Sequence, residues 1–351
     1  MMDEIKEKVK HTSIGSILLE NFDSKFLKLI SKPSFQNIYQ FSANIPRQFS
    51  SFFGYEIQLS NDENKADFLL CIHNFKVFYE VISNEIFIKK FDKETAEGLQ
   101  CFANWMFANK GTAQTICNIW IEIDHGDLAT TQPKLNFFLG PKTNTNKLEI
   151  LLATEQTFKL LYNKQVAATT LKLLLEIYSK LRNQSFISQI GMMNARNNES
   201  LRLFIQKIDR EDFLPLLNRI EYKYITDNQL VKLINICLQN TKHTDLDIDI
   251  LEKVKENIGL ECYFDTIKQA ILFLQLLFKE KLCTLDNYIN LTTHLTSMSI
   301  DEDGDFQHFF SHFKISYKPS IGADAKAYIG YAESKIAHKI IETKPLNQRL
   351  A

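Results

Sequence analysis

The chain has 351 residues, of which 45% are hydrophobic and 24% are charged. This is enough apolar material for a continuous core, and it excludes a disordered chain. With 41 basic and 42 acidic side chains the net charge is -1, so the chain lacks the positive excess that non-specific nucleic-acid binding requires. Residues 1–10 are charged and carry no apolar signal segment, and no apolar run approaches the roughly 20 residues that span a bilayer. We expect a cytoplasmic protein with no nucleic-acid or membrane partner.

The hydrophobic period changes repeatedly along the chain. Asp92 is a candidate N-cap for a helix through Asn109. From Cys117 to Asp124 the apolar residues alternate with polar ones, which predicts a half-buried strand. A second strand is expected at Leu135–Gly140, followed by one long amphipathic helix at Glu155–Leu181. The elements expected after it are strands 186–194 and 200–207, separated by Asn197 and Asn198, helices 210–220 and 227–238, strands 245–251 and 258–264, helices 266–278 and 284–295, strands 312–318 and 325–330, and a closing helix to about residue 341.

This order predicts an α+β fold in which pairs of strands alternate with helices. A further, earlier pair is expected between Asp67 and Phe91, which brings the count to about ten strands in five pairs. Strands joined by short turns are antiparallel, and closure into a barrel surrounded by helices would remove the unpaired edges. Glycine and proline are scarce and no linker divides the chain. We therefore expect one barrel domain at residues 65–345, with a helical or irregular segment at 1–64 packed on it.

The strand residues that alternate with the apolar ones are strongly polar. If the helices cover the outside, these residues point into the barrel, which would then hold solvent or a ligand. The same pattern is also typical of an open antiparallel sheet with one solvated face, that is, an interaction module without a pocket. The inward set is Asn118, Trp120, Glu122, Asp124, Asn136, Phe138, Arg202, Phe204, Gln206, Asp245, Asp247, Asp249, Glu261, Tyr263, His312, Lys314, Ser316, Lys318, Lys326 and Tyr328.

A barrel of paired antiparallel strands with outer helices and a polar lumen resembles the ABBA, or PT-barrel, family of aromatic prenyltransferases. Residues 120–124, a polar turn and residues 133–138 look like that family's strand pair, in which an aspartate-ended strand precedes a Lys-x-Tyr strand. Lys326-Ala327-Tyr328 has the Lys-x-Tyr form itself. The sequence departs from the family pattern at Asn136 and Phe138, where a tyrosine is expected, and at Glu261, where a cation is favoured.

The resemblance implies specific roles for the inward residues. Cations and tyrosines on successive strands would hold an allylic diphosphate, and Glu122 would be the catalytic acid–base group that orients the acceptor. Glu122 and Arg202 are open to a simpler interpretation as a buried ion pair, and Lys318 to one as a solvated residue beyond the strand end. The predicted diphosphate-binding residues are Arg202, Lys314, Lys326 and Tyr328, with Lys318 as a further cation, and the predicted acceptor- and prenyl-binding residues are Trp120, Phe138, Phe204 and Tyr263.

The resemblance predicts transfer of an allylic prenyl group from a diphosphate donor to an aromatic or peptide acceptor in natural-product biosynthesis. The alternative is a non-catalytic barrel that binds a peptide or aromatic metabolite as an accessory protein. No cofactor is certain, although Mg²⁺ is an option, and no metal-binding residues are assigned. His308 and His312 lack the further ligands of a zinc site. The run Asp245–Asp249 could bind a cation but is more typical of a solvated face.

Overall fold

The computed structural model describes residues 13–20, 26–109, 114–130, 132–143, 145–196, 199–298 and 306–333. Within these ranges ten antiparallel strands close into a barrel in the order β1-β10-β9-β8-β7-β6-β5-β4-β3-β2, so the predicted barrel is confirmed and the open sheet is excluded. The strands are β1 (Phe52–Gln58), β2 (Ala66–Ile72), β3 (Ile116–Ile123), β4 (Asn136–Pro141), β5 (Phe186–Met192), β6 (Leu201–Gln206), β7 (His243–Ile250), β8 (Val254–Tyr263), β9 (Phe306–Lys318) and β10 (Gly322–Glu333).

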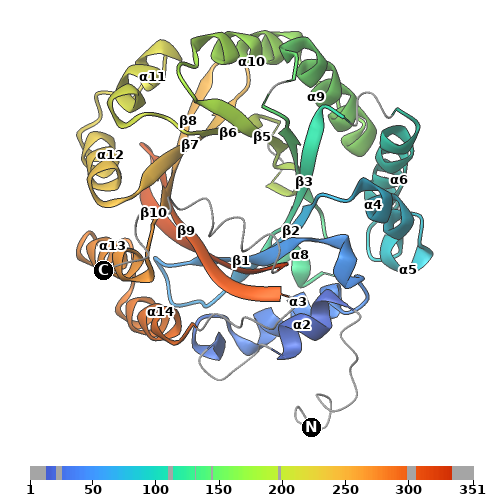
Figure 1. The fold of residues 1–351 in the computed structure, drawn as a ribbon, viewed down its shortest axis with the longest axis horizontal. Coiled ribbons are helices and arrows are strands. Elements are labelled where there is room, and N and C mark those ends of the chain that lie inside the picture. The colour runs from blue at the N-terminus through green and yellow to red at the C-terminus, as the bar shows by residue number, and fades with distance from the viewer. Residues whose placement is uncertain are drawn as a thin grey trace, which may run out of the picture.

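Helices surround the strands as an outer ring, which Figure 1 shows in a view along the barrel. Most begin at a side chain that caps the free backbone N–H groups, such as Asp92 before α6 and Thr266 before α13. The described α-helices are α2 (Ile14–Glu20), α3 (Lys32–Ser42), α4 (Phe75–Ile82), α5 (Glu85–Ile88), α6 (Lys93–Ala108), α8 (His125–Leu128), α9 (Lys147–Tyr162), α10 (Ala168–Lys180), α11 (Phe213–Arg219), α12 (Asn228–Asn240), α13 (Ile267–Lys279) and α14 (Leu285–Ser297). Short 3₁₀ helices lie at η1 (Phe26–Lys28), η2 (Arg47–Phe49), η3 (Asn194–Arg196) and η4 (Arg210–Asp212).

The hydrophobic core lies between the barrel wall and this helical ring. Ile121, Leu203 and Ile315 alternate with lumen residues on their strands and are 0–1% exposed. They point outward, as the sequence pattern predicts, so each strand buries one apolar face against helices. The interior of the barrel is left to the polar alternates. None of the helices in the described ranges is long and apolar enough to cross a membrane.

Two predictions about the elements are wrong. Only β2 falls between Asp67 and Phe91, because the rest of that stretch forms α4 and α5. Asn74 caps α4, and Phe78, Val81 and Ile82 form its buried face at helical spacing. The single helix expected at 155–181 is two helices, α9 and α10. Asn163 adopts a left-handed conformation with φ of 49° and ends α9.

The first strand of the barrel lies upstream of residue 65, where the barrel domain was expected to start. β1 pairs with β2 on one side and with β10 on the other, so it closes the barrel. The strands approach closely at this seam: a Cβ on Gly54 would lie 2.4 Å from the Ile329 carbonyl oxygen. The division into segments 1–64 and 65–345 stays a prediction. Asn197 and Asn198, and the closing helix expected to about residue 341, lie outside the described residues.

Candidate functional site

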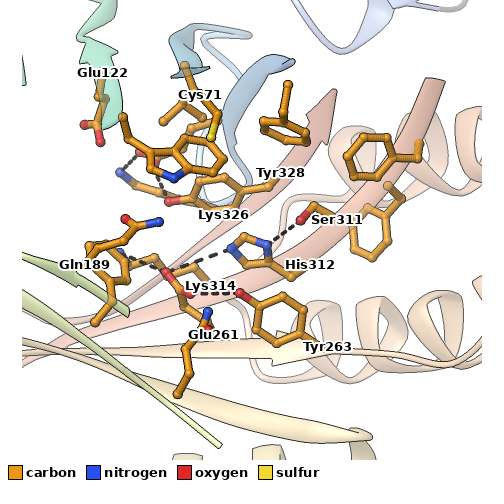
Figure 2. A pocket seen from close by; sticks show the side chains of 18 of the residues that line it. Cys71, Glu122, Gln189, Glu261, Tyr263, Ser311, His312, Lys314, Lys326 and Tyr328 are labelled. Carbon is orange, nitrogen blue, oxygen red and sulfur yellow. Dashed lines mark hydrogen bonds and ion pairs between the residues drawn. The ribbon is translucent and has the colours of Figure 1, made fainter. Parts of the chain in front are cut away.

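The barrel encloses a cavity of about 1170 Å³. Every residue predicted for the site except the further cation Lys318 lines it, and side chains from several strands converge there in Figure 2. Glu261, which was placed on the same face, lines it as well. The structure therefore brings the set together, whereas the roles assigned to its members stay predictions. The set is Glu122, Arg202, Lys314, Lys326, Tyr328, Trp120, Phe138, Phe204 and Tyr263.

Strand register explains this convergence. On β9, Lys314 lies opposite Glu261 of β8 and opposite Lys326 of β10, so three charged side chains on adjacent strands face one interior. Gly259 leaves space for them, since a Cβ there would lie 2.8 Å from Lys314 Cε and 2.9 Å from Asp247 Cβ. A side chain at this position would displace the lysine.

One group of charges belongs to strands β6 to β9, and we call it the β7–β8 cluster. Arg202 donates to Asp249 through Nε at 2.8 Å and Nη2 at 3.0 Å, and its Nε lies 3.5 Å from Asp247. Lys314 donates to Asp247 and lies 3.7 Å from Glu261. These contacts form a continuous buried network. The cluster consists of Arg202, Asp245, Asp247, Asp249, Glu261 and Lys314.

The pKa values of the carboxyl groups in this cluster shift in different directions. Burial raises the pKa of Asp245 to about 8, with Glu261 adding to the effect. It also raises the pKa of Glu261 to about 7, although Lys314 opposes the shift. For Asp249, burial is outweighed by Arg202, which lowers the pKa. Asp245 and Glu261 can therefore be protonated near neutral pH, whereas Asp249 is ionised.

A second group lies on β1, β2, β3, β10 and the turn η3, and we call it the β1–β3 cluster. Glu56 accepts hydrogen bonds from Lys326 and Tyr328. Arg196 Nη2 donates to Glu122 Oε1 and Asp124 Oδ1, both at 2.6 Å. The same nitrogen lies 3.8 Å from Asp67. The cluster consists of Glu56, Asp67, Glu122, Asp124, Arg196 and Lys326.

The carboxyl groups of this cluster also divide into two kinds. Burial raises the pKa of Glu122 to about 7, against the effect of Arg196. It raises the pKa of Asp67 well above its usual range, with Glu56 adding to it. Burial acts on Glu56 too, but Lys326 and Arg196 outweigh it and hold its pKa well below its usual range. Glu56 is therefore held ionised, whereas burial favours the protonated forms of Glu122 and Asp67.

Aromatic side chains form much of the remaining wall. Successive ring centroids of His243, Tyr263, His312 and Tyr328 are 4.5, 4.7 and 4.2 Å apart, so these four rings stack in a row. Burial, with Lys314, lowers the pKa of His312 to about 3, which keeps its imidazole neutral. Figure 2 shows His312 between Tyr263 and Tyr328. The rings cover one another's faces within the row, so together they form an aromatic wall of the cavity.

An acidic triad is the candidate for a metal. One oxygen each from Glu56, Asp67 and Glu122 lies within 4.8 Å of the others, and carboxylate oxygens are the donors that Mg²⁺ prefers. However, Glu56 already accepts from Lys326 and Glu122 from Arg196. A divalent ion would have to displace these fixed cations, so the residues do not fit it as they stand and we derive no step through a metal.

The sequence interpretation missed three members of the β1–β3 cluster, namely Glu56, Asp67 and Arg196. Glu56 sits among apolar residues of β1, a segment that was not recognised as a strand. The alternation of Tyr55, Glu56 and Ile57 was a signal in the sequence that could have predicted a strand with Glu56 on its polar face. Arg196 lies on η3 rather than on a strand, so alternation gives no information on it. The suggested pair of Glu122 with Arg202 is wrong: Arg196 binds Glu122, and Asp249 binds Arg202.

Lys318, the further cation, lies apart from both clusters. Its side chain is 38% exposed, its ammonium is 3.1 Å from Glu256, and it does not line the cavity. Trp120 behaves differently, because its indole Nε1 is buried without a hydrogen-bond partner in the described part of the chain. It can donate a hydrogen bond to a bound molecule.

No protein-family model matches this chain, and no curated protein matches it. Among solved structures, AnaPT from Neosartorya fischeri matches over 93% of this chain and 96% of its own, with 12% identity and a TM-score of 0.53. The 5-dimethylallyl tryptophan synthase from Streptomyces coelicolor, solved in complex with DMASPP and Trp, matches over 91% of this chain and 95% of its own, with 8% identity and a TM-score of 0.48.

The closed ten-strand topology and the match to AnaPT along almost the whole of both chains agree. The fold is that of the PT barrel. The resemblance found in the sequence is therefore confirmed for the fold. At 12% identity the likeness says nothing about which molecule this PT barrel binds.

Proposed function

We propose that this PT barrel transfers an allylic prenyl group from a diphosphate donor to an aromatic or peptide acceptor bound in its lumen. The observation that carries the proposal is the convergence of Arg202, Lys314, Lys326 and Tyr328 on the cavity that also exposes aromatic faces. A diphosphate leaving group needs several fixed cations around its developing charge, and these act most strongly where water is excluded.

The lumen cations would bind the donor while remaining paired. Arg202 and Lys314 are anchored from behind by Asp249 and Asp247, which leaves their cavity sides to contact a ligand. Such anchoring fixes the position of each cation before the donor arrives. It also cancels the net positive charge of each site, so the donor must gain affinity from hydrogen bonds such as that of Tyr328 as well as from charge.

In the transfer step, the bond between the allylic carbon and the diphosphate oxygen breaks and its electron pair leaves with diphosphate. The allylic carbon forms a new bond to the acceptor atom, which releases a proton. Glu122, whose pKa is raised to about 7 by burial, is the base assigned to that proton. Trp120 and Tyr328 present ring faces that stabilise an allylic cation.

One observation favours a second candidate, a barrel that binds a peptide or aromatic metabolite without transferring anything. Arg196, Arg202, Lys314 and Lys326 each contact at least one carboxylate in the described structure. Paired cations attract an anion less than free ones do. If diphosphate does not bind to these paired cations, the cavity can still bind an aromatic ligand.

Thermal stability with and without dimethylallyl diphosphate, geranyl diphosphate and inorganic diphosphate tests the proposal, with and without Mg²⁺. A ligand that binds only the folded protein raises the unfolding midpoint. We expect a saturable rise with both allylic donors, abolished in the double variant Glu56→Gln/Lys326→Met, which removes an ion pair as a unit.

Lys318→Met, which removes a lysine outside the cavity, is the matched control and should keep the rise. Acceptors are then screened by mass spectrometry for the gain of one prenyl group. No rise with any donor under either condition contradicts the transfer proposal and leaves the binding barrel.

A further inference from the structure

The two charged clusters hold more carboxyl groups than cations. In the described structure the β1–β3 cluster contains the four carboxyl groups of Glu56, Asp67, Glu122 and Asp124 with two basic groups, Arg196 and Lys326. The β7–β8 cluster likewise has two basic groups, Arg202 and Lys314. Its four carboxyl groups are Asp245, Asp247, Asp249 and Glu261. The residues that line the cavity include five carboxyl groups and five lysine or arginine side chains, so the lining lacks the excess of cations expected of a site for an anion alone.

Glu261 is the surplus carboxyl group that best faces the cavity. Asp247 and Asp249 pair with Lys314 and Arg202, and Asp245 accepts from the Lys207 backbone N–H at 3.1 Å. Glu261 has no such close cationic partner, because Lys314 Nζ is 3.7 Å from its Oε1. Its Oε2 accepts a hydrogen bond from Tyr263 at 3.0 Å.

The imidazole of His312 points independently to a ligand at this place. His312 is 9% exposed and lines the cavity, and its Nε2 has no hydrogen-bond partner in the described residues. That nitrogen lies 4.0 Å from Glu261 Oε1, while Nδ1 contacts Ser311 Oγ at 2.9 Å. A buried polar atom without a partner is costly, so a bound molecule that contacts Nε2 would remove that cost.

The rings beside Glu261 form a continuous aromatic wall. Tyr263 stacks on His243 at 4.5 Å and on His312 at 4.7 Å, and His312 stacks on Tyr328 at 4.2 Å. Because the faces of Tyr263 and His312 cover one another, a bound cation would pair with the Glu261 carboxylate rather than lie over a ring. Figure 2 shows Tyr263, Glu261 and His312 on the same side of the pocket.

We infer that the acceptor carries an ammonium or guanidinium group on an aromatic or apolar body, with its charge held by Glu261 beside His312 Nε2. The word acceptor rests on the proposed function, whereas the preference for a positive charge does not. Glu261 supplies the ion pair, His312 Nε2 supplies a polar contact, and the rest of the cavity contacts the body of the ligand.

This inference makes binding depend on pH. The charged and titratable groups around Glu261 are Asp245 and Asp247 on β7, Lys314 and His312 on β9, Tyr263 on β8, and Glu56 and Tyr328 across the lumen. Because the pKa of Glu261 is about 7 in the free protein, a cation binds only the ionised fraction. Affinity should rise about tenfold from pH 6 to pH 8, with one proton released on binding near pH 6.

Tryptamine, tryptophol and indole-3-propionate share an indole body and differ in charge. Calorimetric titration of the full chain with each, without any diphosphate, tests the inference. We expect tryptamine to bind at least tenfold more tightly than tryptophol and indole-3-propionate to bind most weakly. Repeating the tryptamine titration at pH 6 in two buffers of different ionisation enthalpy measures the released proton.

Glu261→Gln should abolish the preference for tryptamine and its pH dependence. Glu256→Gln, which removes a carboxylate outside the cavity, should change neither. Equal binding of the three ligands, absent binding of all three, or tighter tryptamine binding at pH 6 than at pH 8 would overturn the inference.

The outcomes separate this inference from the proposed function. Tryptamine binding without any effect of the allylic diphosphates would retain the cation site and reject prenyl transfer. Stabilisation by the diphosphates without a preference for tryptamine would do the reverse.

Discussion

The two charged clusters each contain four carboxyl groups and two basic groups but are built differently. In the β7–β8 cluster, members lie opposite one another on adjacent strands: Arg202 opposite Asp249, and Glu261 opposite both Asp245 and Lys314. The β1–β3 cluster needs the seam that joins β1 to β10, and it needs Arg196 from a turn. One cluster thus follows from strand register, whereas the other exists only when the barrel has closed.

This difference extends to solvent exposure. The Arg202 side chain is 12% exposed, whereas that of Arg196 is 33% exposed. A charge deep in the barrel is stabilised by its ion-pair partner, because water cannot solvate it if that partner is removed. Charges nearer the end of the barrel retain some access to water.

The largest contrast is expected between two arginine substitutions. Arg202→Ala leaves Asp249 and Asp247 buried with one cation fewer, and we expect the free energy of unfolding to fall by about 3–5 kcal/mol. Arg196→Ala should cost about 1–2 kcal/mol, because Arg196 itself and its partners Asp124 and Asp67 are more accessible to water. Denaturant unfolding at pH 7 measures both, and a larger loss for Arg196→Ala would reverse the comparison.

The second contrast concerns the sign of the effect of two carboxyl substitutions. Folding raises the pKa of Glu261 from 4.5 to about 7. The folded state therefore binds this proton more tightly than the unfolded state. The resulting contribution to the free energy of unfolding is fully present below about pH 4.5 and is lost as the pH rises through 7. Glu261→Gln should therefore stabilise the protein by about 2–3 kcal/mol at pH 8 and by little at pH 4.5.

Glu56 should behave in the opposite way. Its pKa falls on folding, against burial and because of Lys326, so its contribution is present above about pH 4.5 and is lost as pH falls towards the folded pKa. Glu56→Gln should destabilise the protein by about 3 kcal/mol at pH 7. Unfolding curves across pH measure both variants, and effects of the same sign at pH 8 would contradict the assigned ionisation states.

A smaller contrast separates two tyrosine hydroxyls. Tyr328 donates to the ionised Glu56, and Tyr263 donates to Glu261, which keeps its proton below pH 7. Hydrogen bonds to charged groups are the stronger ones, so at pH 6 Tyr328→Phe should cost about 2 kcal/mol and Tyr263→Phe about 1 kcal/mol. Equal losses at pH 6 would indicate that Glu261 is ionised there.

The smallest effect is expected outside both clusters. Lys318→Ala removes an ion pair with Glu256, in which the side chains are 38% and 35% exposed. Such pairs contribute less than about 1 kcal/mol. The same denaturant experiment measures it, and a loss comparable to that of Arg202→Ala would mean that Lys318 belongs to the buried network.

The sequence by itself determined the strand pairs from β3 to β10 and the inward face of each of these strands except β5. Alternation with period two decides which residues share a face, and for this reason Glu122, Arg202, Lys314 and Lys326 were found together. The lengths of the helices and the points where they end did not follow from the sequence. Asn163 can adopt a left-handed conformation, but only the packed structure shows that it ends a helix there.

The tertiary structure decided which charges pair. Alternation places Glu122 and Arg202 in one lumen but does not fix which cation each carboxylate binds, and Arg196 reaches Glu122 from a turn that carries no periodic signal. Glu56 enters the site only because the first and last strands pair across nearly the whole chain. Partner choice depends on distances between strands far apart in sequence, and local patterns do not contain those distances.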